Sequence, residues 1–431
     1  MTEFVRRHPA RDTARTGGVI LYVGSRLPAL SETFVYREML GLRTLGRPTL
    51  AASLYPPRPF DGDPALSALA AETFVIYTRA NLQKLPRTVL RHPRQMLTAI
   101  GEALHADHPS LRSRLKHIVQ AGIGIQTAGQ LRDRKIEHVH AHMANAPAMV
   151  ALYLARSLGV PFSFTGHAAD LFVQRAALGF KLQQASFVAC ISHWHRGFYR
   201  AIVPLDDRRL PLVRCSVAVP ARVQPERQEL VAVARLIPKK GIDLLLRAFA
   251  GAPALSDWTL QVLGDGDDRA RLEALAAELQ VADRVYFAGA RPHADCLAAI
   301  ATAGIVALPC RTATNGDKDG IPVVLMEAMA AARVVIAGDL PAIRELIENG
   351  KTGLLVPPDS VSALGAALAE LAGNPGLRSA LGLAARSAVA EEFSDRVNWQ
   401  RLVVAFDMTR GAPQPRGQAR AKLVPWAKAA A

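Results

Sequence analysis

The C-terminal half of the chain alternates between short apolar runs and segments with a helical period. The helical period is clearest in RARLEALAAEL (269–279) and PVVLMEAMAAA (322–332). Six apolar runs have the length and composition of buried strands, at residues 229–236, 259–264, 284–289, 304–310, 334–338 and 353–357. Strands and helices in alternation predict a parallel sheet that is covered on both faces and binds ligands at the carboxyl ends of its strands.

The N-terminal half shows the same pattern less regularly. VILYVG (19–24) predicts a strand that ends in a loop, and residues 138–143, 148–157 and 160–165 predict a strand, a helix and a second strand. Residues 203–228 are rich in Pro and Arg and lack a period, which is typical of a hinge. We therefore expect an α/β protein with two Rossmann-like, doubly wound domains that face each other across a cleft.

Composition narrows the class of partner. At 431 residues, 50% of them hydrophobic, the chain can bury two cores, and its formal net charge of +15 favours an anionic partner. The four cysteines lie far apart without a C-x-x-C pair, which indicates a reducing compartment rather than a disulfide framework or zinc knuckle. Because residues 1–18 contain no apolar signal region and no apolar run reaches membrane-spanning length, we expect a cytoplasmic protein.

Part of the positive charge is concentrated in residues 79–117, where eight Lys and Arg residues face only Glu102 and Asp107. The segment also contains spaced apolar residues, namely Leu82, Leu85, Val89, Leu90, Met96, Leu97, Ile100, Leu104, Leu111 and Leu115. This pattern predicts amphipathic helices on an anionic membrane surface; the alternative is that the apolar face packs against the N-terminal sheet. Since no aromatic residue is interleaved with the cations, we expect no nucleic-acid partner.

Two acids stand eight positions apart in GDKDGIPVVLMEAMA (316–330), Asp319 in a loop and Glu327 inside the following helix. The loop begins like a calcium-binding EF-hand. That template requires a bidentate Glu at position 326, which is Met326, and Pro322 stands where the loop needs ordinary backbone. A calcium site is therefore rejected, and Pro322 instead marks the first turn of a helix.

A second stretch, VARLIPKKGIDLLL (233–246), provides cations at a matching place. Arg235 closes a strand and Lys240 precedes a helix, whose free N–H groups and dipole favour anions. The alternative is that both are ordinary loop cations. If Asp319 and Glu327 lie opposite them, the cations can hold a diphosphate while the acids accept hydrogen bonds from hydroxyls. A diphosphate between two hydroxyl-rich rings is a nucleotide-sugar.

Histidines offer a competing interpretation. His138, His140 and His142 alternate along one strand and share a face, as at the start of a metallohydrolase site. The C-terminal half supplies no matching ligand cluster, so we expect no metal. His167 differs because it follows a strand and would face the cleft, where it could contact a substrate; the alternative is a histidine at the start of a helix.

Several motifs in order carry a resemblance to a known family. They are SETFVYREM (31–39), HVHAHMANAPA (138–148), FTGHAADLF (164–172), VARLIPKKGIDLLLRAF, GDKDGIPVVLMEAMA and KTGLLVPPD (351–359). Over residues 19–395 the chain resembles family 4 retaining glycosyltransferases of the GT-B fold, within the colanic-acid and exopolysaccharide group. The chain departs from the family at three places. Asp319 replaces the first Glu of the family's pattern of two Glu separated by seven residues. The hinge has CSVAVP (215–220) where relatives have Gly-Val-Asp, and Ala332-Arg333 stands where they have a Gly after the acidic helix.

The resemblance implies roles for individual residues. Arg235 and Lys240 would neutralise the leaving diphosphate, His167 and Asp319 would lie near the donor sugar, and Glu327 would bind the ribose hydroxyls. The remaining donor-binding residues would be Gly320, Ile321, Pro322 and Val323. The acceptor side would be formed by Gly24, Ser25, Ser31, Glu32, Thr33 and Asp170. No metal or cofactor is implied, since the basic pair neutralises the charge, and front-side attack is favoured over double displacement.

The resemblance also implies an organisation and a partner set. The expected parts are a basic disordered tail (1–18), an acceptor-side domain (19–210), a hinge (211–228), a nucleotide-sugar-binding domain (229–395), a helix that packs back on the first domain (396–410) and a basic tail (411–431). The expected donor is a UDP- or GDP-sugar, and the acceptor is a glycan or a polyprenyl-diphosphate-linked glycan at the inner face of the cytoplasmic membrane. The alternatives are a sugar-nucleotide epimerase of the same fold, which would need further catalytic acids, and a non-catalytic partner.

Overall fold

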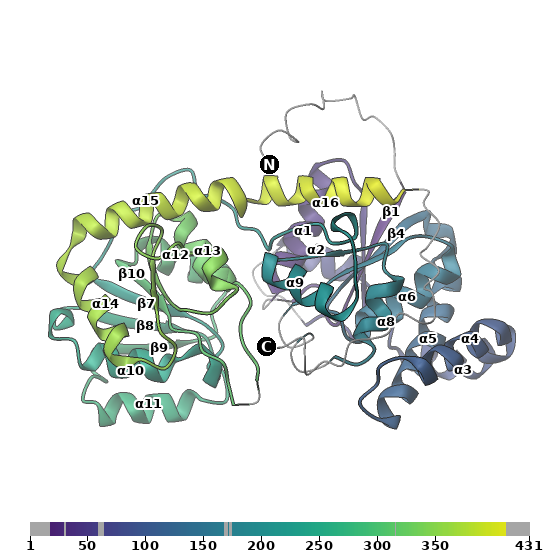
Figure 1. Cartoon of the computed structure of the whole chain (residues 1–431), viewed down its shortest axis with the longest axis horizontal. Coiled ribbons are helices and arrows are strands. Elements are labelled where there is room, and N and C mark those ends of the chain that lie inside the picture. Colours follow the sequence, from purple (N-terminus) through teal and green to yellow (C-terminus); the bar gives the residue numbers. More distant parts are fainter. Residues whose placement is uncertain are drawn as a thin grey trace.

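The computed structural model describes residues 18–29, 32–58, 64–167, 171, 175–314 and 316–410. Apart from Gly18, the two basic tails expected at the ends of the chain lie outside the described residues. The described chain forms two six-stranded parallel sheets (Figure 1). The predicted α/β class with two doubly wound domains is therefore confirmed.

The N-terminal sheet has the strand order β3-β2-β1-β4-β5-β6. Its strands are β1 (Val19–Gly24), β2 (Thr49–Ser53), β3 (Phe74–Val75), β4 (Ile136–His142), β5 (Phe162–Thr165) and β6 (Phe187–Ala189). Predicted strands at 19–24, 138–143 and 160–165 are confirmed as β1, β4 and β5 with small shifts at their ends. The order turns at β1 and β4, and in such sheets ligands bind beside the turning point, at the carboxyl ends of the strands.

Helices cover both faces of the N-terminal sheet. They are α1 (Thr33–Thr44), α2 (Pro64–Glu72), α3 (Arg79–Arg91), α4 (Pro93–His105), α5 (Leu111–Leu131), α6 (Ala146–Leu158), α8 (Leu178–Gln184) and α9 (His193–Ile202). Side-chain oxygens of Thr78, Ser110 and Ser192 cap α3, α5 and α9 by accepting a backbone N–H of the first turn. Helix α6 is almost wholly buried between α5 and the sheet, as its apolar sequence predicts.

The C-terminal sheet has the order β12-β11-β10-β7-β8-β9. Its strands are β7 (Glu229–Val233), β8 (Thr259–Leu263), β9 (Val285–Gly289), β10 (Ile305–Leu308), β11 (Val334–Gly338) and β12 (Leu354–Val356). Its helices are the short η4 (Pro238–Lys240) and η6 (Ile343–Glu345), then α10 (Ile242–Ala250), α11 (Arg269–Glu278), α12 (His293–Thr302), α13 (Val323–Ala330), α14 (Val361–Gly373) and α15 (Pro375–Glu392). All six predicted strands and both predicted helices are present.

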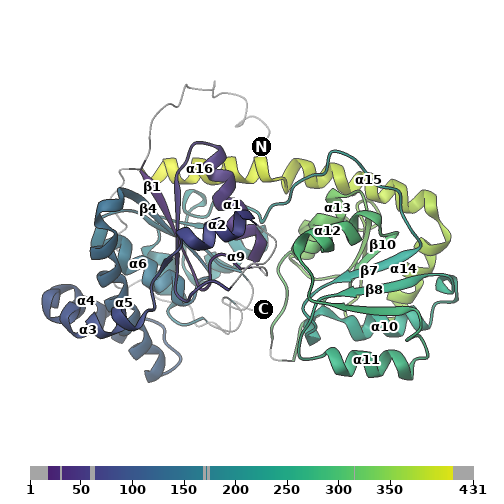
Figure 2. The same cartoon turned by 180° about the vertical axis from the view of Figure 1, so that it is seen from behind.

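The last helix, α16 (Asp395–Thr409), returns to the N-terminal domain. Leu402 and Phe406 of α16 belong to the same buried cluster as the side chains of β1 and α1. Arg37 of α1 forms an ion pair with Asp395 at 2.6 Å. Figures 1 and 2 show α15 and α16 running in succession along the same edge of both domains. No helix among the described residues is both long and apolar enough to cross a bilayer.

Candidate functional site at the domain junction

Charged side chains cluster where β7 and β10 end in the C-terminal domain. Lys239 and Lys240 lie in η4, just before α10. The Nζ of Lys240 is 2.9 Å from Oδ2 of Asp319, and the Nζ of Lys239 is 3.0 Å from Oδ2 of Asp317 and 3.5 Å from Oδ1 of Asp319. Arg235 is exposed beside them, and its positive charge acts on Lys240. The structure thus brings Arg235, Lys240 and Asp319 together.

The sequence predicted that Asp319 would lie opposite Arg235 and Lys240, and the structure differs from this prediction. Asp319 contacts Lys240 directly, so the acid and the cation are neighbours on the same wall. Burial favours the neutral acid, but Lys240 and Lys239 outweigh it and hold the pKa of Asp319 below its usual value. Burial likewise opposes the charge of Lys240, while Asp319 raises its pKa above the usual value. The thiol of Cys310 donates to Oδ2 of Asp319 at 3.2 Å. Both partners are therefore charged at neutral pH.

Glu327 lies on α13 and is only 8% exposed. Its Oε1 is 2.7 Å from Nε2 of His293, the first residue of α12. The two residues are 34 positions apart and no motif joins them, so the sequence alone does not predict a role for His293. The described structure thus gives the predicted ribose-binding acid a specific partner that fixes its orientation.

The remaining donor-side residues form the entrance to α13. Pro322 is the N-cap residue of the helix and Val323 is its first residue, while Ile321 is buried. Pro322 has no N–H group, so donor hydrogen bonds from this backbone can come only from Gly320, Ile321 and Val323. A Cβ built on Gly320 would lie 3.4 Å from Cε1 of His195. This loop therefore approaches the N-terminal domain closely.

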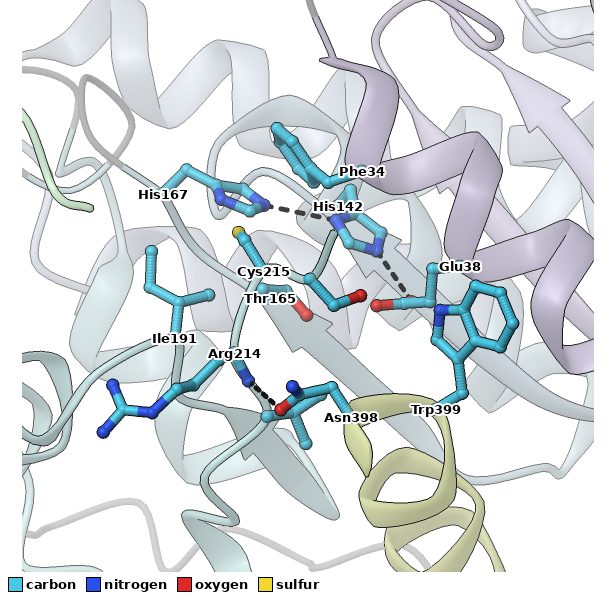
Figure 3. A pocket seen from close by; sticks show the side chains of 12 residues that line it. Phe34, Glu38, His142, Thr165, His167, Ile191, Arg214, Cys215, Asn398 and Trp399 are labelled. Carbon is cyan, nitrogen blue, oxygen red and sulfur yellow. Dashed lines mark hydrogen bonds and ion pairs between the residues drawn. The ribbon is translucent and has the colours of Figure 1, made fainter. Parts of the chain in front are cut away.

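The N-terminal domain contributes a chain of three side chains (Figure 3). Nε2 of His142 is 3.1 Å from Oε1 of Glu38, and Nδ1 of His142 is 3.2 Å from Nε2 of His167. The hydroxyl of Tyr22 donates to the same Oε1 at 2.7 Å, and the ring of Phe34 lies 4.6 Å from that of His167. His142 ends β4 and Glu38 lies on α1, so the chain runs from the helix across the sheet end to His167.

These hydrogen bonds are consistent with one tautomer for each of the two histidines. If the carboxylate of Glu38 accepts from Nε2 of His142, a single proton on that ring leaves Nδ1 of His142 to accept. His167 then donates through Nε2, which makes Nδ1 the acceptor nitrogen of that ring. Burial lowers the pKa of His167 well below its usual value, and the neighbouring His142 adds to this effect. His167 is therefore a neutral, oriented imidazole.

The histidine ladder of β4 is held by hydroxyls of the neighbouring strand. His138 and His140 both lie 2.7 Å from Oγ of Ser163, and Nε2 of His140 lies 3.0 Å from Oγ1 of Thr165. Among the described residues, Glu38, His140 and His142 form a group whose ligand atoms lie within 4.8 Å of one another, close enough to hold a metal. Both ring nitrogens of His140 are already engaged, so hydrogen bonding accounts for the ladder.

Four of the predicted acceptor-side residues lie at the end of β1 or at the start of α1. Gly24 ends β1, Ser25 follows it, and Glu32 and Thr33 stand at the start of α1. Strand β1 pairs with β4, which ends in His142, while Glu32 and Thr33 directly precede Phe34 in the sequence. Ser31 and Asp170, also expected on the acceptor side, lie outside the described residues.

The two domains meet at the start of α9. Oε2 and Oε1 of Glu345, in η6, accept the backbone N–H groups of His193 and Trp194 at 2.7 Å each. Glu345 also forms an ion pair with Arg214 of the hinge segment at 2.9 Å. The Nζ of Lys318 lies 5.0 Å from the centre of the Trp194 ring. These contacts join η6 and the acidic loop of the C-terminal domain to the start of α9, and no sequence motif had indicated them.

Comparison with known proteins shows that most of the C-terminal half is similar to a known family. Residues 220–388 match the family described as glycosyl transferases group 1. A GDP-mannose-dependent alpha-(1-6)-phosphatidylinositol monomannoside mannosyltransferase of Mycolicibacterium smegmatis is 32% identical over 191 residues, 44% of this chain and 50% of that protein. The glycosyltransferase WcaL of Salmonella typhimurium, assigned to colanic acid biosynthesis, is 36% identical over 171 residues, 39% of this chain and 42% of that protein. The chain thus spans at most about half the length of these curated relatives.

Solved structures extend the similarity to nearly the whole chain at the level of the fold. Anabaena HepE in complex with UDP and glucose superposes with a TM-score of 0.66 at 16% identity, covering 91% of this chain and 100% of that one. Sucrose-phosphate synthase of Thermosynechococcus elongatus gives 0.68 at 17% identity, covering 91% and 98%. The predicted GT-B fold is confirmed, and within it residues 220–388 match the glycosyl transferases group 1 family.

Proposed function

We propose that this chain is a retaining, metal-independent glycosyltransferase that uses a UDP- or GDP-sugar in exopolysaccharide, capsule or lipopolysaccharide synthesis. The observation that carries the proposal is the group of cations, Arg235, Lys239 and Lys240, at the start of α10 inside a group 1 domain. Relatives described as GDP-mannose-dependent and a neighbour crystallised with UDP and glucose support a nucleotide-sugar donor.

The charged wall is suited to a diphosphate. In the described structure Lys239 forms an ion pair with Asp317, and Lys240 forms one with Asp319. Phosphate oxygens are the same kind of acceptor and carry more charge, so a diphosphate can share or replace these partners. Arg235 is exposed beside them and adds a third positive charge. Glu327 would then accept hydrogen bonds from the ribose hydroxyls.

The proposed step moves the glycosyl group on one face of the sugar. The hydroxyl oxygen of the acceptor bonds to the anomeric carbon as the bond from that carbon to the diphosphate oxygen breaks. The acceptor proton passes to the departing phosphate, and both electrons of the broken bond leave with it. Arg235 and Lys240 stabilise the charge that develops on the diphosphate, while neutral His167 and the Asp319 loop hold the sugar.

We further propose a lipid-linked or glycan acceptor and a position on the inner face of the cytoplasmic membrane. A relative described as acting on a phosphatidylinositol monomannoside supports an acceptor in a membrane. A second relative, assigned to colanic acid biosynthesis, supports the exopolysaccharide setting.

The test is release of nucleoside diphosphate from a panel of UDP- and GDP-sugars, with and without a polyprenyl-diphosphate-linked glycan. A transferase releases the nucleoside diphosphate in proportion to glycosylated lipid, and the anomeric proton of the product keeps the configuration of the donor. An epimerase would yield an isomeric sugar without any acceptor. A non-catalytic partner would bind the donor and leave it intact.

A further inference from the structure

Nine large apolar side chains are exposed on three consecutive helices at one end of the N-terminal domain. We call this surface, formed by α3, α4 and the first part of α5, the apolar–basic platform. Its exposed members are Leu82, Val89, Leu90, Leu97, Ile100, Leu104, Leu111, Leu115 and Val119. Seventeen large apolar side chains are exposed in the described chain, so more than half lie within these 38 residues (82–119). Such a concentration indicates an interaction surface.

The stripes on α4 and α5 show how the platform is oriented. On α4, Met96, Ala99 and Ala103 point inward and are buried. A second stripe at the same spacing, formed by Leu97, Ile100 and Leu104, is exposed by 68%, 37% and 59%. On α5, Leu111, Leu115 and Val119 follow one another by one turn and are likewise exposed. The alternative raised by the sequence, that the apolar residues pack on the sheet, therefore holds only for a minority such as Met96.

Cations surround the exposed stripes. The exposed basic side chains are Arg79, Lys84, Arg87, Arg91, Arg94, Arg112 and Lys116. Glu102, the only acid on α3 or α4, is turned inward, where its oxygens accept from Tyr153 at 2.6 Å and from Arg156 at 2.9 Å. The outer face of α3 and α4 is therefore apolar and positive, with no exposed carboxylate among its described residues.

We propose that the apolar–basic platform docks on an anionic lipid bilayer. Its leucines would enter the boundary between headgroups and acyl chains while the arginines and lysines contact lipid phosphates, which is the composition of helices that lie in a membrane interface. Aromatic anchors, which dominate protein–protein hot spots, do not occur among its residues, and uncompensated positive charge matches an anionic surface.

The place of the platform in the fold fits this role. Figures 1 and 2 show α3 and α4 at the outer edge of the N-terminal domain, away from the C-terminal domain. The same domain carries the histidine chain and the residues proposed for the acceptor side. A membrane-held acceptor would thus reach the domain that binds the bilayer. The access of a membrane-held acceptor rests on the proposed function, but the docking of the platform on a bilayer does not.

Co-sedimentation of the full chain with vesicles tests the proposal. We expect binding to vesicles that contain phosphatidylglycerol, little binding to pure phosphatidylcholine, and weaker binding as salt rises. The triple variant Leu97→Ser, Ile100→Ser and Leu104→Ser should lower the partition coefficient by at least about tenfold. In the wild-type protein each of these apolar side chains moves from water into the bilayer on docking, and the variant loses that gain. Leu383→Ser, Val404→Ser and Met408→Ser, exposed by 56%, 57% and 56% on α15 and α16, form the matched control.

A second triple variant, Arg87→Gln, Arg91→Gln and Arg94→Gln, should abolish the preference for anionic vesicles. Unchanged circular dichroism shows that each variant is folded. Equal binding to neutral vesicles, no binding to anionic ones, or equal losses in the control would overturn the proposal. So would a wild-type dimer that the leucine variant converts to monomer, because the surface would then join two copies. Release of nucleoside diphosphate with a soluble acceptor should be unchanged in these variants, so a failure of docking is separate from a failure of catalysis.

Discussion

The two domains contribute walls of opposite character to the junction. The C-terminal wall is ionic, with Lys239 and Lys240 paired to Asp317 and Asp319 and with Arg235 beside them. In the N-terminal wall Glu38 contacts His142 at the end of β4, and His142 contacts His167 just after β5. We call it the neutral wall because of the imidazoles of His140 and His167. Burial lowers the pKa of His140 and His167 well below the usual value, so these rings stay uncharged at neutral pH.

Under the proposed function, this difference implies a division of labour. A departing diphosphate gains negative charge, and fixed cations stabilise that change most strongly when they are already in place. A sugar carries no charge, so the wall that meets it needs oriented donors and acceptors rather than ions. The ionic wall should therefore determine the rate of bond breaking, and the neutral wall should determine how the sugar is held.

The largest expected effect is the loss of a cation from the ionic wall. Lys240→Ala and Arg235→Ala should each lower turnover by about 10²–10³, the usual result of removing one preorganised charge-stabilising group. Arg247→Ala, an exposed cation in the last turn of α10, is the control and should leave turnover unchanged. Steady-state release of nucleoside diphosphate measures the effect. Near-normal turnover in either site variant would reject the diphosphate assignment.

Breaking the neutral wall should have a smaller effect. Glu38→Gln replaces an obligate acceptor by an amide that can also donate, so the tautomers of His142 and His167 are no longer fixed. Loss of one charge-assisted hydrogen bond predicts a fall in turnover of about tenfold. Nitrogen-15 shifts of the His167 ring report the tautomer independently of activity. Tyr22→Phe removes another donor to Glu38 but keeps the chain, so the ring shifts should remain those of the wild type.

A third change affects how the donor is bound. His293→Ala removes the side chain that lies 2.7 Å from Glu327. Losing one orienting hydrogen bond, worth about 1 kcal/mol, should raise the KM for the donor by about fivefold while kcat stays constant. Donor titrations at saturating acceptor separate the two constants. A lower KM would mean that His293 competes with the ribose instead of orienting the acid.

The two walls also differ in how much of them the sequence could predict. The ionic wall lies in two short stretches next to strongly periodic elements, so Arg235, Lys240 and Asp319 could be placed beforehand. The neutral wall depends on side chains far apart in sequence, such as Glu38 and His142, whose hydrogen bond joins residues 104 positions apart. Glu38 lies inside a quoted motif, yet only the packing of α1 on the sheet gives it a partner.

The same contrast holds for the fold. Every predicted strand of the C-terminal sheet is present because each is flanked by clear helices and turn residues. Three N-terminal strands, β2, β3 and β6, were not predicted. They have five, two and three residues, and their sequences, TLAAS, FV and FVA, are too short to show a period. Their place is set by neighbouring strands, which is information that a local pattern does not contain.

The smallest expected effect is that of a chelator, which should leave turnover unchanged. Three cations stand at the ionic wall, so neutralising the leaving diphosphate needs no Mg²⁺ or Mn²⁺ there. At the neutral wall, Glu38, His140 and His142 are close enough to hold a metal, but hydroxyls of β5 engage both nitrogens of His140. Turnover is compared before and after dialysis against EDTA, and then with Mn²⁺ added. If chelation abolished turnover and Mn²⁺ restored it in the wild type but not in His140→Gln, the N-terminal wall would be a metal centre. Restoration that instead required Asp317 would place the ion among the acids of the C-terminal wall. Constant turnover in all conditions leaves one wall ionic and the other neutral, without a metal in either.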